Sequence, residues 1–265
     1  MPAILFATLL LIPFWLPLRV EAGWRIVATT KPLASPSPLG SPVQMETSVS
    51  QNRIKYRTQV WEQIVNLRTQ RLAVINHIGQ TYWEGPIDEY LTVVAGQTME
   101  IRTQRDKLMQ RLSPEQRMIM EKRGGPFDIS AATLEITVTS TSEEEMVAGY
   151  KARKYAVLRN GEPYEETWVA GEINFETEID MQKLQTFIQQ LQASRTTPPG
   201  TVLAELTDLV SKGYPVRTVN VLSHITKEVT QAEKKNIADE EFAVPEGYTQ
   251  RTLTEVMALP KVRMH

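Results

Sequence analysis

Polar and apolar side chains alternate along three stretches in the first third of the chain. They read RIKYRTQVW (53–61), QIVNL (63–67) and RLAVINHIGQTYW (71–83). Alternation with a period of two, in β-branched and aromatic residues, is typical of half-buried antiparallel strands. The pattern predicts three or four strands between residues 44 and 84. Because neighbouring strand residues face opposite sides of a sheet, only one of Tyr82 and Trp83 can point into the core.

After residue 86 the apolar period lengthens to that of a helix. The stripe consists of Ile87, Leu91, Val94, Ile101, Leu108 and Leu112. It predicts one amphipathic helix of roughly six turns, or two helices bent near Gly96. A second helix should begin at SPEQ (113–116), which offers a serine N-cap followed by proline, and should stop at Gly124–Gly125.

Strands then return. Clean alternation predicts a strand over residues 134–140, and Asn160–Gly161 is a strong signal for the turn of a hairpin over residues 148–172. The acidic run Glu143–Glu145 between them is expected to be a solvated loop.

The last part of the chain predicts two helices and two strands. Asp180 should cap a helix whose stripe includes Phe187, and a short helix should follow over 202–213. Strands are expected at 214–222 and 224–234, and the fold should end at Phe242–Tyr248. This order of strands and helices lacks strict βαβ alternation, and its hairpin-length links favour antiparallel pairing. The prediction is an α+β fold with one curved antiparallel sheet and helices packed on one face.

The N-terminal segment has the pattern of a secretory signal peptide. Residues 3–18 carry no charge, and small or apolar residues occupy the −3 and −1 positions of a cut before Gly23. The alternative is an uncleaved membrane anchor, because no basic residue precedes the apolar run, although that run is short for a span. The predicted organisation is a signal peptide (1–22), a Pro/Ser-rich leader (23–43), a single domain (44–258) and a loose tail (259–265).

Composition narrows the classes of partner and chemistry. The formal net charge is −2, which gives no electrostatic reason to expect nucleic acid. The chain has no cysteine, which excludes disulfides, a thiol nucleophile, cysteine-ligated zinc and an N-terminal lipid anchor on cysteine. We expect no cofactor and no metal site.

No catalytic motif is visible in the sequence. His77, His224 and His265 have no carboxylate or second histidine at a ligand spacing, so hairpin or surface positions are expected for them. There is no GxSxG turn and no glycine-rich phosphate loop. Four methionines in the helical region predict a gap-filling core face, or alternatively a flexible apolar groove: Met99, Met109, Met118 and Met120.

Three segments resemble a family of exported bacterial proteins, the domain of unknown function 4412. They are LRTQRLAVINHIGQTYWEG (67–85), AGYKARKYAVLRNGEPYEETWVAGE (148–172), and KGYPVRTVNV (212–221) followed by IADEEFAVPEGYTQ (237–250). That family looks related to the lipoprotein carriers of the bacterial envelope. The resemblance implies an open half-barrel with helices on its apolar concave face, a periplasmic or extracellular location, and a possible hydrophobic ligand. It implies no catalytic residues.

The leading hypothesis is a non-enzymatic envelope protein that binds a lipid, acyl chain or other apolar small molecule, with helices 87–123 and 180–212 lining or plugging the groove. The candidate ligand-binding residues are Trp61, Tyr82, Trp83, Leu91, Val94, Met118, Tyr155, Trp168 and Phe187. The alternative is an interaction or sensor module with a packed interior and an envelope protein as partner. A hydrolase with a dispersed site is a third, weaker hypothesis. Membrane contact should be transient, or made through an uncleaved N-terminal segment.

Overall fold

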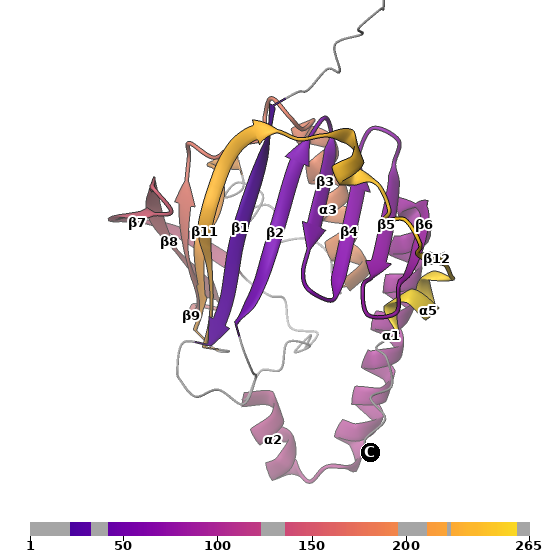
Figure 1. Cartoon of the computed structure of the whole chain (residues 1–265). Coiled ribbons are helices and arrows are strands. Elements are labelled where there is room, and N and C mark those ends of the chain that lie inside the picture. The colour runs from indigo at the N-terminus through magenta and orange to yellow at the C-terminus, as the bar shows by residue number, and fades with distance from the viewer. Residues whose placement is uncertain (1–21, 33–41, 123–135, 196–210, 222–223, 259–265) are drawn as a thin grey trace, which may run out of the picture.

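The computed structural model describes residues 22–32, 42–122, 136–195, 211–221 and 224–258, which build one twelve-stranded sheet (Figure 1). The strand order is β12-β6-β5-β4-β3-β2-β1-β11-β10-β9-β8-β7. Neighbouring strands pair antiparallel except at one edge, where β12 runs parallel to β6. The strands are β1 (Ala22–Pro32), β2 (Val43–Ser50), β3 (Arg53–Arg57), β4 (Trp61–Asn66), β5 (Arg71–Asn76), β6 (Thr81–Pro86), β7 (Ile136–Val147), β8 (Tyr150–Arg159), β9 (Glu162–Ala170), β10 (Tyr214–Asn220), β11 (Ile225–Asn236) and β12 (Thr249–Gln250).

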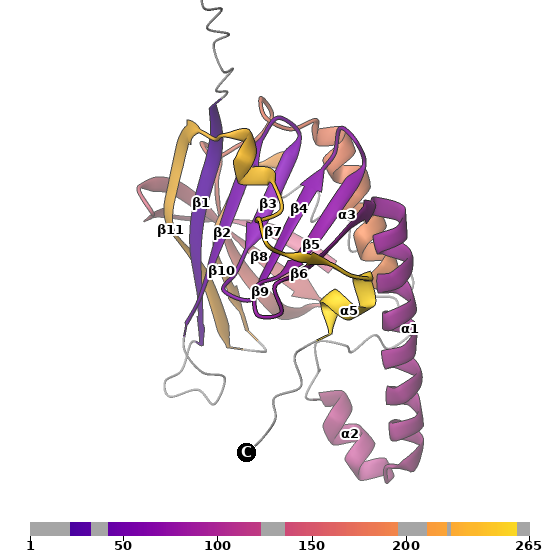
Figure 2. The same cartoon turned by 45° about the vertical axis from the view of Figure 1, so that its right-hand side comes forward.

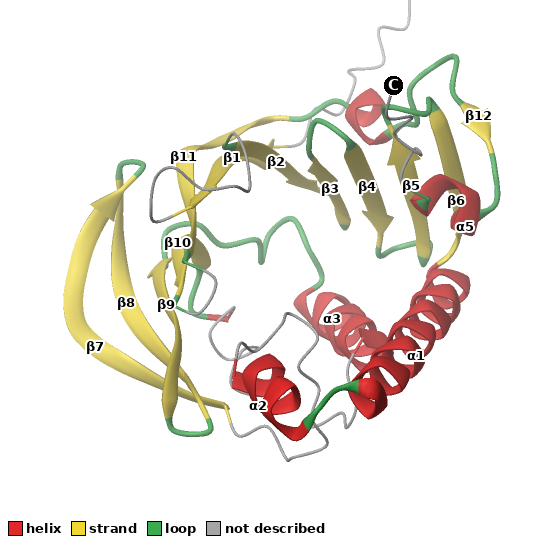
Figure 3. Ribbon diagram, turned by 90° about the horizontal axis from the view of Figure 1, so that it is seen from below, coloured by secondary structure: helices red, strands yellow, loops and turns green. Residues whose placement is uncertain are grey.

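The sheet is curved and open, and the longer helices lie on its concave side (Figure 3). The helical elements are α1 (Ile87–Arg111), α2 (Pro114–Lys122), α3 (Met181–Arg195), the 3-10 turn η1 (Asp239–Phe242) and α5 (Leu253–Met257). One large buried cluster joins the concave face to the first half of α1 and to α3, with Trp83, Tyr90 and Phe187 among its members. This arrangement confirms the predicted fold class.

The predicted leader is wrong in its first half, because residues 22–32 form β1. This strand lies between β2 and β11 and pairs with both along its length. Trp24, Ile26 and Ala28 point into the main core, so the apolar alternation in GWRIVA is that of a strand. The rest of the leader, residues 33–41, lies outside the described residues, as does the predicted signal peptide up to residue 21.

Five strands, rather than three or four, occupy residues 43–86. The run predicted as one strand over 53–61 is broken by a turn at Thr58. The Thr58 hydroxyl accepts hydrogen bonds from the backbone N–H groups of Val60 (3.3 Å) and Trp61 (2.9 Å). A side chain that satisfies nearby backbone donors in this way stabilises a turn against an extended strand.

The acidic run Glu143–Glu145 lies in β7 and not in a loop. A register shift between Ser140 and Glu144 interrupts the pairing with β8, and the acidic side chains form ion pairs with basic neighbours. Cross-strand pairs of opposite charge offset the low strand propensity of glutamate.

Most helix and turn signals in the described part of the chain are confirmed. α1 is one continuous helix through Gly96. Ser113 and Gln116 form the reciprocal hydrogen bonds of a capping box, and Asp180 accepts from the N–H groups of Gln182 and Lys183. Asn160 and Gly161 both have positive φ, as a tight hairpin turn between antiparallel strands requires. The predicted helix over 202–213 and the glycine stop at 124–125 fall largely outside the described residues.

The fold continues past Tyr248, where the sequence predicted its end. We call residues 237–257 the C-terminal strap. The strap crosses the outer face of the sheet, pairs with edge strand β6 through β12, and ends in α5 beside α1 (Figure 2). Its outer part buries a small cluster over Ile64, Ala73 and Ile75, so β5 is covered on both faces.

Candidate functional site

The nine predicted ligand-binding residues divide among several places. Those that lie in the main core cluster or pack against it are Trp61, Trp83, Leu91, Val94, Trp168 and Phe187. Tyr82 packs in the outer cluster beneath the strap, and Tyr155 forms a separate small cluster with Val169. Met118 is exposed on α2. The prediction of an inward-facing position is therefore wrong for Met118, and Tyr155 is buried apart from the main core. Of Tyr82 and Trp83, of which only one could face inward, Tyr82 is the one that faces outward.

Trp83 is the aromatic residue of the Tyr82–Trp83 pair that faces the concave side. Its side chain is 5% exposed, and its ring centroid lies 6.5 Å from that of Tyr90 on α1. Alternation along β6 turns Tyr82 to the outer face, where it packs against the strap cluster.

A glycine two residues on lets the Trp83 indole lie against its own strand. A Cβ built at Gly85 would lie 2.3 Å from Cζ2 of Trp83, far inside contact distance. Glycine is therefore required at position 85 for this position of the ring. Pro86, the next residue, is the N-cap of α1.

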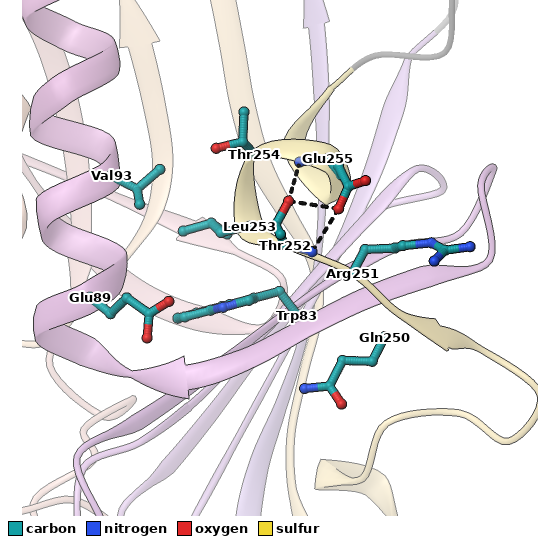
Figure 4. A pocket seen from close by; sticks show the side chains of 9 residues that line it. All are labelled: Trp83, Glu89, Val93, Gln250, Arg251, Thr252, Leu253, Thr254 and Glu255. Carbon is teal, nitrogen blue, oxygen red and sulfur yellow. Dashed lines mark hydrogen bonds between the residues drawn. The ribbon is translucent and has the colours of Figure 1, made fainter.

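An open groove of about 650 Å³ lies over Trp83, between α1, β6 and the strap (Figure 4). Its lining residues are Trp83, Glu89, Val93, Gln250, Arg251, Thr252, Leu253, Thr254 and Glu255. Trp83, Val93 and Leu253 supply apolar surface, while the others bring amide, hydroxyl and charged groups. Such a mixture suits a ligand that has both an apolar part and polar groups.

The strap wall of the groove is held by backbone hydrogen bonds to β6 and to the turn before it. The N–H of Thr249 donates to the carbonyl of Gln80 (3.0 Å), and that of Arg251 donates to the carbonyl of Tyr82 (2.8 Å). Behind the wall, the Asn76 side chain donates to the Val256 carbonyl over 3.1 Å. The groove is thus assembled from segments far apart in the sequence.

A capping box closes the first turn of α5 at the groove rim. The N–H of Thr252 donates to the Glu255 carboxylate (3.0 Å), and the N–H of Glu255 donates to the Thr252 hydroxyl (3.4 Å). The hydroxyl and N–H of Thr252 lower the pKa of the exposed Glu255 carboxyl. With Glu89 and Glu255 against Arg251, the lining carries one more negative than positive charge.

On the outer face, the strap is fixed by ion pairs with β3. Arg53 lies 2.6 Å from the Asp239 carboxylate, and its guanidinium sits 4.4 Å from the centre of the Phe242 ring. The Lys55 ammonium donates to both the side chain and the carbonyl of Glu241, each at 3.0 Å.

Sequence reasoning missed a polar cluster around His77. Glu62 is 2% exposed, and its carboxylate lies 3.9 Å from Lys55 Nζ, 3.6 Å from Arg57 Nε and 3.4 Å from His77 Nε2. Nδ1 of His77 is 3.0 Å from the hydroxyl of Tyr248 on the strap. No local spacing signalled this cluster, because its members come from β3, β4, the turn after β5 and the strap.

The His77 cluster is a contact between elements and lacks the geometry of a proton relay. Nε2 of His77 has no hydrogen-bond partner, so its approach to Glu62 is not an aligned bond. Burial lowers the His77 pKa from 6.5, with Arg57 and Lys55 acting in the same direction and Glu62 opposing them. His224 is exposed at a turn with positive φ, and His265 lies outside the described residues.

The methionine prediction fails at two positions. Met99 is 65% exposed and Met118 is 55% exposed, so neither fills the core. The apolar stripe of α1 is buried at Ile87 and Val94 but reaches the surface at Ile101 and Leu108.

Neither a metal site nor a membrane-spanning helix is found among the described residues. No three His, Asp or Glu side chains there gather in a way that could hold a metal ion. None of the helices in the described ranges combines the length and the apolar character needed to span a membrane.

Solved structures resemble the chain only loosely, and no curated protein matches it. A structure of PNGF-II aligns over 89% of this chain and 32% of its own, at 11% identity and a TM-score of 0.38. The MucA/MucB complex of Pseudomonas aeruginosa aligns over 84% of this chain and 56% of its own chain, at 10% identity and a TM-score of 0.34. A structure of MucB aligns over 88% of this chain and 60% of its own, at 11% identity and a TM-score of 0.32. The chain thus spans less than two thirds of each. At such TM-scores the alignments transfer no site, ligand or partner.

A family model gives a firmer result. The model for the domain of unknown function DUF4412 matches residues 84–248, more than half of the chain. The segments at 148–172 and 212–221 lie within the match, whereas the segment at 67–85 falls almost wholly before it. The chain belongs to the DUF4412 family.

Proposed function

We propose that this protein binds an apolar small molecule, such as a lipid or acyl chain, without catalysing a reaction, and that it does so in the groove between α1, β6 and the strap. The observation that carries the proposal is the groove over Trp83, which has an apolar floor and a polar rim. Ligand pockets of drug-sized molecules usually have volumes of about 300–1,000 Å³ and a few polar groups that fix orientation. The groove, at about 650 Å³, falls within that range and is open to solvent along one side.

The proposed site differs from the one predicted from the sequence. The concave face where we expected the ligand is occupied by α1 and α3, whose side chains join the main core cluster. Of the nine predicted residues, only Trp83 lines the groove. The groove instead uses strap residues from Gln250 to Glu255.

We further propose that the protein acts in the bacterial envelope and is a relative of the lipoprotein carriers. The charge-free segment at residues 3–18 and the cut pattern before Gly23 support export. An open curved sheet with helices on its concave face supports the relationship. The lack of a catalytic motif in the sequence, and the unaligned His77 and Glu62, support a role without catalysis.

Quenching of tryptophan fluorescence by a brominated acyl chain tests the proposal. Bromine quenches only nearby indoles, so dibromostearate in the groove should quench Trp83 saturably. Trp83→Phe should remove most of the quenching, whereas Trp168→Phe should keep it, because Trp168 lies elsewhere in the core between Lys154 and Arg217.

A variant that blocks the groove distinguishes specific binding there from nonspecific binding of the probe to the protein surface. Val93→Glu places a charge in the groove and should weaken binding at least tenfold, a cost of about 1.4 kcal/mol. Ile101→Glu is the matched control on the exposed part of the same helix. If both variants bind as the wild type does, or if no saturable quenching occurs, the ligand proposal fails.

A second function is favoured by the exposed apolar stripe of α1. Ile101 is 44% exposed and Leu108 is 48% exposed, one helical heptad apart. Such a surface supports the alternative of an interaction module with an envelope protein as partner. A photo-cross-linker at position 108 should then trap one defined protein, and Ile101→Glu should abolish that product.

A further inference from the structure

The C-terminal strap contacts both faces of the half-barrel. Its first part, from Ile237 through η1 to Tyr248, lies on the outer face. It then pairs with β6 at the sheet edge and ends in α5, which walls the groove (Figures 2 and 4). Undocking of the strap would therefore remove one side of the groove.

Charged contacts hold the outer part of the strap. Asp239 and Glu241 each pair with a basic side chain of β3, at 2.6 Å to Arg53 and 3.0 Å to Lys55. The basic side chains are nearly buried, whereas on the strap Asp239 is largely exposed and Glu241 partly exposed. The strap thus supplies the counter-charges for cations that are fixed on the sheet.

His77 stands between the strap and a buried carboxylate. It contacts Tyr248 of the strap through Nδ1 and lies 3.4 Å from Glu62 through Nε2. Its edge also meets the Tyr248 ring, with centroids 5.9 Å apart. A proton added to His77 would make Nδ1 a donor, for which the Tyr248 hydroxyl must act as acceptor, and would bring a third cation beside Lys55 and Arg57.

We propose that the strap is the release element of the ligand groove, docked near neutral pH and detached on acidification through His77. This inference rests on the proposed function, because the regulated site is the groove itself. The ligand would be held at neutral pH and discharged where the pH is lower.

The groups that face His77 determine whether acid strengthens or weakens docking of the strap. They are Lys55 and Arg57 from β3, Glu62 from β4 and Tyr248 from the strap. Burial lowers the His77 pKa in the docked state, and the two cations add to this effect against Glu62. Lys55, Arg57 and Glu62 stay beside His77 when the strap leaves, so undocking changes mainly its burial. Once Tyr248 no longer covers it, His77 takes up a proton more readily. Docking is therefore fully stable above the unperturbed pKa of about 6.5 and weakens as the pH falls through the lower, docked value.

A cross-linked strap gives the sharpest test. The chain has no cysteine, so Thr81→Cys with Thr249→Cys, which are paired neighbours in β6 and β12, adds one defined disulfide. Binding is followed with N-phenylnaphthylamine, an apolar fluorophore whose charge does not change in this range. From about pH 7.5 to pH 5.5, the wild-type affinity should fall about threefold or more. The oxidised pair should keep its affinity, and the reduced pair should behave as the wild type. Equal losses in the oxidised and reduced forms would overturn the proposal.

A variant at His77 tests whether protonation of this residue causes the strap to detach. His77→Gln keeps a polar side chain but cannot take up a proton, so its affinity should change less than twofold over the same pH interval. His224→Gln, at an exposed turn, is the matched control and should retain the full wild-type response. A full response in His77→Gln would assign the acid sensitivity to another group and would refute the role of His77.

Hydrogen exchange separates failure of the strap from failure of the groove. The protection factors of the Thr249 and Arg251 amides report strap docking without any ligand, because these amides donate to the carbonyls of Gln80, just before β6, and Tyr82 in β6. They should fall on acidification in the wild type and not in His77→Gln. If they fall while no probe binds at either pH, the proposed ligand function fails but the strap transition stands. If they do not change, the release proposal fails whatever the groove binds.

Discussion

The Trp83 indole lies against Gly85, two residues further along the same face of β6. A methyl group at Gly85 would meet the indole at 2.3 Å, so the ring cannot stay where it is in a Gly85→Ala variant. We expect this variant to lose about 1–3 kcal/mol of unfolding free energy through overpacking. It should also lose the quenching by dibromostearate, since the groove floor moves. Urea denaturation and fluorescence titration measure the two effects. An unchanged titration would show that the indole is not the floor of a binding site.

Replacing Gly96 by alanine is expected to stabilise the protein, in contrast to the same change at Gly85. This residue is exposed in the middle of α1, and a Cβ there meets no atom within 4 Å. Gly96→Ala should therefore raise the unfolding free energy by about 0.5–1 kcal/mol, because alanine loses less backbone entropy in a helix. Urea denaturation tests the change, and binding of the acyl probe should not alter. A loss of stability would mean that α1 is not a continuous helix at this position.

The Lys55–Glu241 pair should contribute measurably to docking of the strap. A double-mutant cycle with Lys55→Met and Glu241→Gln isolates their interaction, which we expect to be about 1 kcal/mol, because Lys55 is buried while Glu241 is partly exposed. The free energies come from chemical denaturation of the four proteins. Effects that add within about 0.3 kcal/mol would contradict the pairing.

The capping box of α5 should stabilise the groove wall. Thr252→Ala removes a hydroxyl that caps the Glu255 N–H, with an expected cost of about 1 kcal/mol. Thr254→Ala in the same turn should stay within about 0.5 kcal/mol of the wild type. Denaturation of both variants measures the difference. Equal losses would place the contribution outside the cap.

The sequence predicted strands, turns and helix caps that depend on residues close together in the chain. Alternation located most strands, the Asn160–Gly161 turn was recognised, and the Ser113 and Asp180 caps lie where their side chains predicted them. The strand at residues 22–32 was not predicted, because the Pro- and Ser-rich composition of the residues after it indicated an extended leader for the whole segment. A clearer signal was present in Trp24, Ile26 and Ala28, which occupy alternate positions with Arg25 and Val27 between them.

The candidate site could be predicted only in part, because it is built by long-range contacts. Trp83 was identified as a large aromatic residue on a strand, and alternation limited the choice to Trp83 or Tyr82. Nothing in the sequence shows that Leu253 would return to lie beside it. The same holds for Glu62 and His77, whose approach depends on strand register.

The position of β1 has a consequence for how the chain acquires its structure. This strand begins at Ala22, yet one of its two partners, β11, begins only at Ile225. Pairing between segments so distant in sequence must wait for the intervening chain and is slow to form. The centre of the sheet therefore cannot be completed until most of the polypeptide has been made. For a protein that we propose is exported, this delay keeps the chain unfolded, the state in which it can thread through a membrane channel.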